Sequence, residues 1–290
     1  MTQPSVSILM CNYNNAQYIA QAIESVLSQS YNNWELSILD DCSTDNSMEI
    51  IDDYSKKDCR IKVFRNEVNM GYGKSMAKNI ENSSGKYGAI LDPDDALEPH
   101  ALEIMIENIT KSDSLVGAYS QMYYCDSNLR PRKVFEYSRA IPKGQSYLEY
   151  GKMAMTHFFL FDRQKFLSYG NVDTSFRNAL DQDWYYKIEE IGEVVFVPEP
   201  LYFYRVSPTG LSQGIYKKYY TQLDHFKIKQ KAIKRRGIKD PKVIAKILKS
   251  SVLEIHFSKY RILKSENSPL AILFYFRWLY KKIMYKIRKI

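Results

Sequence analysis

The chain has 290 residues, of which 45% are hydrophobic and 26% are charged. This composition excludes an intrinsically disordered chain, because it can bury the core of one large or two modest domains. Four cysteines follow no zinc or redox spacing, and no run of about 18 uncharged apolar residues predicts a membrane-spanning helix. Since the N-terminus has no signal peptide, we expect a cytoplasmic protein.

The net charge of +8 is distributed unevenly along the chain. Residues 216–290 contain 21 Lys and Arg against four Asp and Glu, a balance of +17. Residues 1–215 contain 20 against 29, a balance of −9. We therefore expect a body at 1–215 and a basic region at 216–290 that meets an anionic surface.

Strand and helix patterns alternate through the first hundred residues. In chain order we predict a strand at 5–10, a helix at 16–28, a strand at 34–39, a helix at 46–54, a strand at 61–64, a helix that follows a glycine turn at 69–73 and ends near 82, and a strand at 88–91. Strands separated by helices of this length predict a mostly parallel central sheet flanked by helices.

The pattern is less regular beyond residue 96. We predict a helix at 96–109, a strand at 115–124, an irregular segment at 130–151, an apolar run at 158–161, a helix from 163, a loop ending at 179–184, and strands at 194–197 and 201–204. From residue 216 onward the sequence predicts several basic helices, with breaks near 237, 241 and 269.

Ligand-capable side chains follow three of the predicted strands. The clusters are CNYN at 11–14, DDCS at 40–43 and DPDD at 92–95. In open α/β sheets ligands bind at the carboxyl ends of the strands, so we expect the three clusters to converge at one edge.

The DPDD turn places three carboxylates within four residues beside an apolar strand. Such carboxylates repel each other, and a divalent cation or full solvation relieves the repulsion. Oxygen ligands without a nearby His or Cys favour Mg²⁺ or Mn²⁺ bound together with a substrate phosphate. A turn that caps the following helix explains the same residues, and the motif alone does not decide between the two.

Tyr13 and Asp41 add possible parts of a nucleotide site. Tyr13 can stack on a base, and Asp41 can accept a hydrogen bond from a pyrimidine N–H, although a turn aromatic and a helix cap are the simpler explanations of each taken singly. The chain has no G-x-G-x-x-G after the first strand and no complete G-x-x-x-x-G-K-S/T phosphate loop. These absences argue against dinucleotide oxidoreductases and P-loop enzymes.

Five ordered blocks resemble the family 2 inverting glycosyltransferases with the GT-A fold. The blocks are VSILMCNYN, SVLSQSYNNWELSILDDCSTDNS, NMGYGKSMAKN, SSGKYGAILDPDDAL and NALDQDWYYKI. The resemblance covers residues 4–206. It implies one α/β catalytic domain, with a nucleotide-sugar half at 1–98 and an acceptor half at 99–215.

The resemblance also implies roles for residues on the nucleotide side. Tyr13 would contact the nucleoside, and Asp41 would hydrogen-bond a uracil-type base. Asn69 and Lys78, in the glycine-turn block, would belong to the same nucleotide-sugar site.

The acidic residues would carry the metal and the proton transfer. By resemblance, Asp92 or Asp94 would approach the ribose, and Asp94 or Asp95 would bind Mn²⁺ or Mg²⁺ on the diphosphate. Asp183 matches the late acidic pair of the family and would be the catalytic base. That base would remove the proton of the acceptor hydroxyl as it attacks the anomeric carbon.

Three positions depart from the family pattern. Gln182 stands where a Glu usually precedes the base. Val206 and Ser207 follow Tyr204-Arg205 where many relatives have a His that supports the metal. Lys78 stands where relatives often have an Arg, so the planar fork that suits phosphate is missing.

The last predicted helix, LAILFYFRWLYKKIMYKIRKI, is amphipathic and cationic. Phe276, Tyr280 and Ile283 gather on one side and basic residues on the other, with Trp278 expected at an interface. This pattern suits the surface of an anionic membrane. Packing on the catalytic domain and a dimer interface remain alternatives, whereas nucleic-acid binding is not favoured because no recognised module is present.

Together these features predict an enzyme that adds single sugars from a nucleotide diphosphate sugar, in particular a UDP-sugar, to a glycan or lipid-linked glycan in bacterial surface polysaccharide synthesis. A processive synthase is disfavoured because a Q-x-x-R-W motif is missing. A nucleotidyltransferase would need a basic Gly-rich N-terminal signature, which the chain lacks. The alternative outside enzymology is a catalytically silent sugar-nucleotide-binding subunit of a polysaccharide assembly complex.

Overall fold

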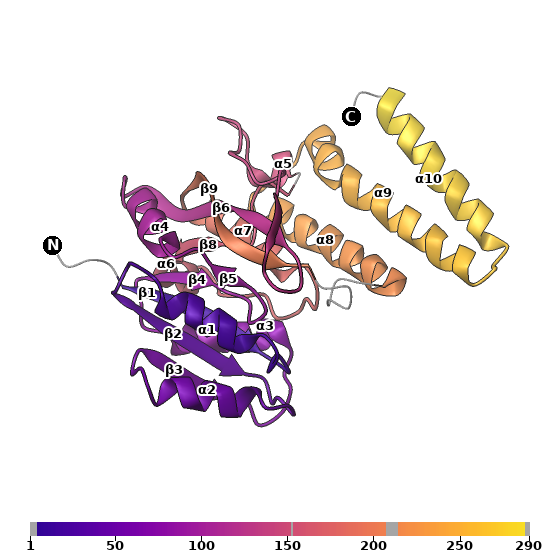
Figure 1. The fold of residues 1–290 in the computed structure, drawn as a ribbon. Coiled ribbons are helices and arrows are strands. Elements are labelled where there is room, and N and C mark those ends of the chain that lie inside the picture. The colour runs from indigo at the N-terminus through magenta and orange to yellow at the C-terminus, as the bar shows by residue number, and fades with distance from the viewer. Residues whose placement is uncertain (1–4, 152, 207–213, 288–290) are drawn as a thin grey trace.

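The structure is a computed structural model and describes residues 5–151, 153–206 and 214–287. In this part of the chain nine strands form one sheet, with the order β3-β2-β1-β4-β8-β6-β9-β5 and with β7 paired to β6. Figure 1 shows helices on both faces of the sheet and three C-terminal helices extending away from it. The predicted α/β architecture with a helical C-terminal extension is confirmed.

The first half of the chain follows the predicted alternation. Its elements are β1 (Val6–Asn12), α1 (Ile19–Leu27), β2 (Trp34–Asp40), α2 (Ser47–Ser55), β3 (Ile61–Arg65), α3 (Tyr72–Asn82) and β4 (Tyr87–Ile90). Strand β1 pairs in parallel with β2 and β4, and β2 pairs in parallel with β3. The carboxyl ends of these strands consequently lie at one edge of the sheet.

The side chains of β1 alternate between the two faces of the sheet. Ile8 and Met10 join the hydrophobic cluster that contains the buried face of α1. Leu9 and Cys11 join a second cluster, which contains Met76 of α3. Because both faces are covered, β1 is buried at every position and its sequence is a nearly continuous apolar run.

The second half completes the sheet with both antiparallel and parallel pairs of strands. Its elements are β5 (Ala96–Leu97), α4 (Ala101–Ile109), β6 (Leu115–Cys125), β7 (Pro131–Val134), α5 (Tyr147–Tyr150), β8 (Phe159–Asp162), α6 (Arg163–Ser168), α7 (Leu180–Ile191) and β9 (Glu193–Arg205). Strand β8 runs antiparallel to both β4 and β6, which brings the start of β8 next to the end of β4.

Three predictions differ from the structure. The segment predicted to be irregular at 130–151 contains the short elements β7 and α5. Residues 96–97, predicted to begin a helix, form β5 because they pair with β9, and α4 begins only after Pro99. The strands predicted at 194–197 and 201–204 are one strand, β9, whose pairing with β6 shifts register near Pro200. Proline has no N–H to donate to a neighbouring strand, so the sequence predicts two separate strands here. In the structure the strand continues, and the pairing shifts register at this point.

The C-terminal region contains α8 (Ile215–Arg235), α9 (Pro241–Ser265) and α10 (Leu270–Ile287). Ile228 and Ala232 of α8 lie in the same hydrophobic cluster as Trp184 of α7. Helix α9 packs on α8, and α10 packs on α9 as the outermost helix (Figure 1). The boundary predicted at residue 215 thus precedes a helix that shares the core of the body.

Helix α10 exposes an apolar stripe to solvent. Ile272, Phe276, Tyr280 and Ile283 are all exposed, and their spacing places them on one face. Trp278 does not belong to this face, because it is half-buried and its ring lies 5.1 Å from the ring of Phe257 on α9. Among the helices that the structure describes, none has the length and apolar character that crossing a bilayer requires.

Candidate active site

The three polar clusters that follow β1, β2 and β4 converge at one edge of the sheet, as predicted. Asn12 at the end of β1 faces Asp40 at the end of β2 in the parallel register. The backbone N–H of Asp41 donates to the Asn12 carbonyl at 2.8 Å, and that of Leu91 donates to the Leu9 carbonyl at 3.1 Å. The pairing between strands therefore continues one residue beyond β2 and β4. It places the acidic turn at 92–95 at the same edge of the sheet as the clusters at 11–14 and 40–43.

Asp40 and Asp41 are adjacent but have different functions in the fold. Asp40 is fully buried, and its carboxylate accepts hydrogen bonds from the Asn12 side chain at 2.8 Å and from the backbone N–H of Ser43 at 2.9 Å. Asp41 points toward the glycine turn, where it accepts from the backbone N–H groups of Met70 at 2.8 Å and Gly71 at 2.7 Å. Asp41 thereby fastens the loop before α3 to the end of β2.

Lys78 is connected to Asp41 through Asn66. The Asn66 amide donates to Asp41 at 2.9 Å, and the Lys78 ammonium donates to the Asn66 carbonyl oxygen at 2.9 Å. Asn69 accepts from the N–H of Gly71 at 3.1 Å, and Gly71 has φ of +83°, a conformation that favours glycine. The structure thus brings Asp41, Asn69 and Lys78 into one loop network.

Tyr13 lies on the same edge with its side chain 47% exposed. Its backbone carbonyl accepts from Asn15, and its ring makes no ring stack within the described residues. An exposed aromatic ring at the carboxyl end of β1 remains available to a flat ligand.

The acidic turn holds its carboxylates in different environments. Asp95 is 1% exposed, and its two carboxylate oxygens accept from the N–H of Arg205 and from the hydroxyl of Tyr202, both at 2.7 Å. Asp94 accepts no side-chain hydrogen bond from another residue in the described chain, although the Arg205 guanidinium donates to its backbone carbonyl at 2.6 Å. Asp95 is therefore bonded within the protein, whereas the carboxylate of Asp94 is open.

Arg205 is buried and holds this turn in place through several hydrogen bonds. Besides Asp94, its guanidinium donates to the Ser127 carbonyl and, at 2.8 Å, to the Gln21 side chain. It also lies 4.3 Å from the centre of the Tyr18 ring. These contacts fix the acidic turn to α1 and β9, so its carboxylates are held in place without a ligand.

Asp92 pairs with a histidine that the sequence analysis does not identify. The Nδ1 atom of His157 lies 3.6 Å from Oδ2 of Asp92, and the His157 ring stacks on Tyr204 with 4.9 Å between ring centres. Burial raises the pKa of Asp92 to about 6; His157 opposes this shift, while Asp94 and Asp181 add to it. In the sequence, His157 is distinguished only as a polar residue directly before an apolar run. It reaches this edge of the sheet because β8 runs antiparallel to β4.

Asp183 is buried in a group of ion pairs between α7 and α8. It is 1% exposed, and its carboxylate oxygens lie 3.0 Å from the Arg235 guanidinium and 3.2 Å from the Lys187 ammonium. A carboxylate enclosed by two cations is stabilised in its ionised form and has no open side toward a substrate. This position does not suit the predicted role of catalytic base.

The charge of Asp181 on α7 acts on residues of the candidate site. It contributes, after burial, to the raised pKa of Tyr185 and, after burial and Asp94, to that of Asp92. Residues two apart on a helix are separated by about 200°, so Asp181 and Asp183 point in nearly opposite directions. The sequence contains a signal for this, since Asp183 and Lys187 have the i, i+4 spacing of a helical ion pair.

No set of three or more His, Cys, Asp or Glu side chains in the described residues is arranged to hold a metal by itself. Burial raises the pKa of Asp94 and of Asp92, because their ionised carboxylates lose hydration there, and a bound cation would favour the ionised form. Mg²⁺ and Mn²⁺ bound with one or two carboxylates, substrate phosphates and water suit such a donor set. The residues present thus fit a cation that arrives with its substrate.

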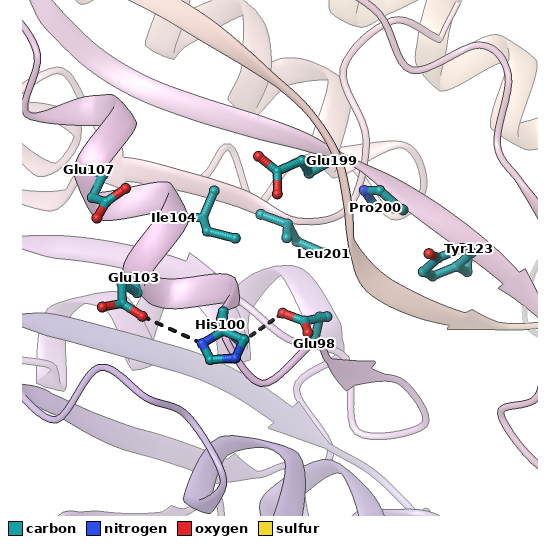
Figure 2. Close-up of a pocket in the computed structure, with 9 residues that line it drawn as sticks. All are labelled: Glu98, His100, Glu103, Ile104, Glu107, Tyr123, Glu199, Pro200 and Leu201. Atoms are coloured by element: carbon teal, nitrogen blue, oxygen red, sulfur yellow. Dashed lines mark hydrogen bonds and ion pairs between the residues drawn. The ribbon is translucent and has the colours of Figure 1, made fainter.

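A cavity of about 470 Å³ lies elsewhere, between α4 and β9 (Figure 2). It is acidic, with Glu103 and Glu107 on α4, Glu199 on β9, and Glu98, while His100 lies beside Glu103 and Glu98. None of the site residues described above lines it, so it is separate from the candidate site.

The chain belongs to glycosyltransferase family 2, because residues 7–170, more than half of its length, match the model described as "Glycosyl transferase family 2". It is therefore a glycosyltransferase. Chondroitin synthase of Escherichia coli is 29% identical over 242 residues, which make up 81% of this chain and 34% of the synthase. Hyaluronan synthase of Pasteurella multocida is 27% identical over 244 residues, 81% of this chain and 24% of that enzyme. This chain thus spans only about a third or a quarter of those relatives.

Solved structures confirm the GT-A fold. Staphylococcus aureus TarS 1–349 in complex with UDP-GlcNAc superposes with a TM-score of 0.65 at 17% identity, covering 88% of this chain and 73% of that chain. The mannosyltransferase PcManGT from Pyrobaculum calidifontis, in complex with GDP-Man and Mn²⁺, gives a TM-score of 0.63 at 13% identity and covers 94% and 79%. At such identities the likeness concerns the fold.

Proposed function

We propose that this protein transfers a single sugar, with inversion, from a UDP-sugar to a hydroxyl of a glycan or lipid-linked glycan in bacterial surface polysaccharide synthesis. The observation that carries this proposal is the convergence of the clusters after β1, β2 and β4 at one edge of the sheet, together with the charge of Asp181 on α7, which contributes to the raised pKa of Asp92. The names of the related synthases, and UDP-GlcNAc in the TarS structure, support the reaction class and the donor.

The donor would lie along the ends of β1 and β2. We assign Tyr13 to stacking on the base and Asp41 to a hydrogen bond with it. Asp41 already accepts from Met70, Gly71 and Asn66, so its second role uses the lone pair that its carboxylate has left. Lys78, held by Asn66, would add positive charge on the diphosphate side, and Asn69 lies on the exposed rim of this network.

Mn²⁺ or Mg²⁺ would be held by Asp94, with Asp92 on the ribose side. When bound, the cation stabilises the negative charge that develops on the departing diphosphate. Asp95, which the resemblance leaves as an alternative metal ligand, is bonded to Arg205 and Tyr202, and we assign it to positioning the turn. His157 would keep the Asp92 carboxylate oriented.

The base in this proposal is Asp181. It would accept the proton of the acceptor hydroxyl while that oxygen attacks the anomeric carbon from the side opposite the diphosphate. Asp183 would act indirectly, because its pairs with Lys187 and Arg235 fix the rotation of α7 about its axis.

The test is turnover of a panel of nucleotide sugars with Mn²⁺, followed as release of the nucleoside diphosphate. We expect one UDP-sugar to be consumed, with loss of turnover in EDTA. The rival proposal of a catalytically silent sugar-nucleotide-binding subunit predicts donor binding without release. Turnover that is insensitive to EDTA would contradict the metal dependence.

We further propose that the C-terminal region holds the enzyme at the inner face of the cell membrane, as a cytoplasmic, peripheral protein. The exposed stripe of Ile272, Phe276, Tyr280 and Ile283 supports this, since Arg277 and Lys282 flank it in the helical projection and are also exposed. An apolar face bordered by cations is complementary to anionic lipid. A lipid-linked acceptor would then lie in the same plane as the enzyme.

A further inference from the structure

A groove of about 420 Å³ runs along α8 beside the loop that precedes α7. We call it the α8 groove; its lining residues are Ser175, Phe176, Asp224, Lys227, Gln230, Lys231 and Lys234. Lys227, Lys231 and Lys234 have the spacing i, i+4, i+7 and form a row on one face of the helix. With a rise of about 1.5 Å per residue, the row is about 10 Å long.

The cations of α8 differ in whether their charge is balanced. Arg235 lies 3.0 Å from Asp183 and 2.7 Å from Glu190, and Arg236 lies 2.8 Å from Glu189. These two arginines therefore serve the contact with α7 and are not available to a ligand.

The lysines of the groove are less completely paired. Lys231 lies 2.6 Å from Asp173 and 4.5 Å from the centre of the Phe176 ring, so its side chain is fixed at the middle of the row. Lys227 and Lys234, on either side, are exposed and have no carboxylate partner in the part of the chain that the structure describes. The ends of the row thus carry two unbalanced positive charges.

The acidic residue in the groove is bonded to the loop before α7 and forms no ion pair with a lysine in the described residues. The Asp224 carboxylate accepts from the backbone N–H of Asn178 at 3.1 Å and from its side-chain amide at 2.9 Å. Asn178 precedes Asp181 by three residues, so this contact also ties one end of the groove to the loop that leads into the proposed base. The groove is therefore linked through Asn178 to the loop that leads into α7.

We propose that the α8 groove binds an anionic segment of the saccharide acceptor, one that bears carboxylate or phosphate groups. This inference rests on the proposed transferase function, because it names the chemistry of the acceptor. Ammonium groups on flexible stems suit such groups at variable spacing, and the exposed Gln230 amide offers hydrogen bonds to sugar hydroxyls. The volume of the groove lies within the range of saccharide-sized ligand sites.

The experiment measures binding of a fluorescent hyaluronan hexasaccharide to the full chain, with a neutral chitin hexasaccharide as comparator. The test variant is K227Q/K234Q, and the matched control is K218Q/K239Q, which removes the same charge from exposed positions outside the groove. We expect the anionic probe alone to bind, about tenfold more weakly in K227Q/K234Q and nearly unchanged in the control, with the difference shrinking at high salt.

Three results would overturn the inference: equal losses in the two double variants, equal binding of the neutral probe, or no binding of the anionic probe. A fourth would reassign the groove to lipid, namely vesicles containing phosphatidylglycerol whose binding depends on Lys227 and Lys234 while the hexasaccharide does not bind. Release of nucleoside diphosphate is measured in the same variants. If no variant or wild-type protein turns over any donor, the proposed function fails, whereas normal donor turnover without probe binding refutes only the groove.

Discussion

At the scale of single residues, two aspartates on α7 lie two positions apart and have opposite surroundings. Asp183 is enclosed by Lys187 and Arg235, whereas Asp181 adds to the burial that raises the pKa of Asp92 and of Tyr185. A catalytic base must be accessible to its substrate, whereas a buried carboxylate must be paired with a cation. The two surroundings therefore suit a proton acceptor and a structural ion pair, respectively.

The first prediction separates the two aspartates. We expect Asp181→Asn to lower kcat for glycosyl transfer by at least about a hundredfold, with the KM for the donor little changed, because general-base catalysis contributes factors of this size. We expect Asp183→Asn to act mainly on stability, lowering the midpoint of thermal unfolding. Steady-state kinetics and calorimetry on both variants make the comparison, and a full loss of kcat in a stably folded Asp183→Asn protein would return the base role to that residue.

The second prediction concerns the pH dependence of stability. The pKa of Asp92 is raised from 3.8 to about 6, so between these values the folded state binds more protons than the unfolded state. The free energy of unfolding contributed by Asp92 therefore falls as pH rises through this window, by up to about 2–3 kcal/mol. In the ligand-free protein we expect Asp92→Asn to become progressively more stable than wild type from pH 4 to pH 7, roughly the window set by these values.

Chemical denaturation of both proteins across that range measures the difference. A stability difference that is independent of pH would contradict the raised pKa. Adding Mn²⁺ with UDP should stabilise wild type more than Asp92→Asn at neutral pH, because a bound cation relieves the repulsion that the substitution removes.

At the scale of elements, the α9–α10 hairpin combines two apolar surfaces. Its inner surface contains Phe257 and Trp278, which pack together, and its outer surface is the exposed stripe of α10. The inner surface holds the hairpin together, so the outer stripe is presented by an already folded element.

The third prediction tests that outer stripe. We expect full-length protein to float with vesicles that contain phosphatidylglycerol, and the double variant Ile272→Ser/Phe276→Ser to lose most of this binding. The matched control is Phe257→Leu, which changes the inner surface and should retain vesicle binding. If the stripe instead joins two copies of the chain, the Ser variants will change the mass measured by light scattering and leave flotation unaltered.

At the scale of the whole molecule, α8 joins the acidic body to the basic region. Arg235 and Arg236 together contact Asp183, Glu189 and Glu190 of α7, and the apolar side of α8 completes the core around Trp184. From the sequence we expect the basic region to meet an external anionic surface. Two of its cations, Arg235 and Arg236, instead form ion pairs within the protein.

The fourth prediction follows from this use of charge. Replacing Arg235 by Gln leaves Asp183 with one cation and Glu190 with fewer donors, and breaking such a buried pair costs about 3–5 kcal/mol. We expect a loss of unfolding free energy of this order for Arg235→Gln and less than about 0.5 kcal/mol for Arg261→Gln on the exposed side of α9. Urea denaturation measures both, and equal effects would show that the contact with α7 is not important for stability.

The nucleotide half of the molecule was accessible from sequence because its signals are local. The apolar run of β1, the glycine turn before α3 and the DPDD turn each lie within a few residues, and parallel strands place their ends together without further information. The merged strand β9 and the short β5 were missed, because both are decided by pairing between residues far apart in the chain, such as Gln121 with Pro200 and Ala96 with Phe203.

The sequence by itself determined the fold class, the family and the acidic turn, since these follow from periodicity and from motifs contiguous in the chain. Only the tertiary structure decided which acids face the site. Asp95 differs from Asp94 because Tyr202 and Arg205 bind its carboxylate. Asp183 differs from Asp181 because cations of α7 and α8 pair with it. The physical reason is that the state and reach of a carboxylate depend on partners brought by distant segments, which a local pattern does not contain.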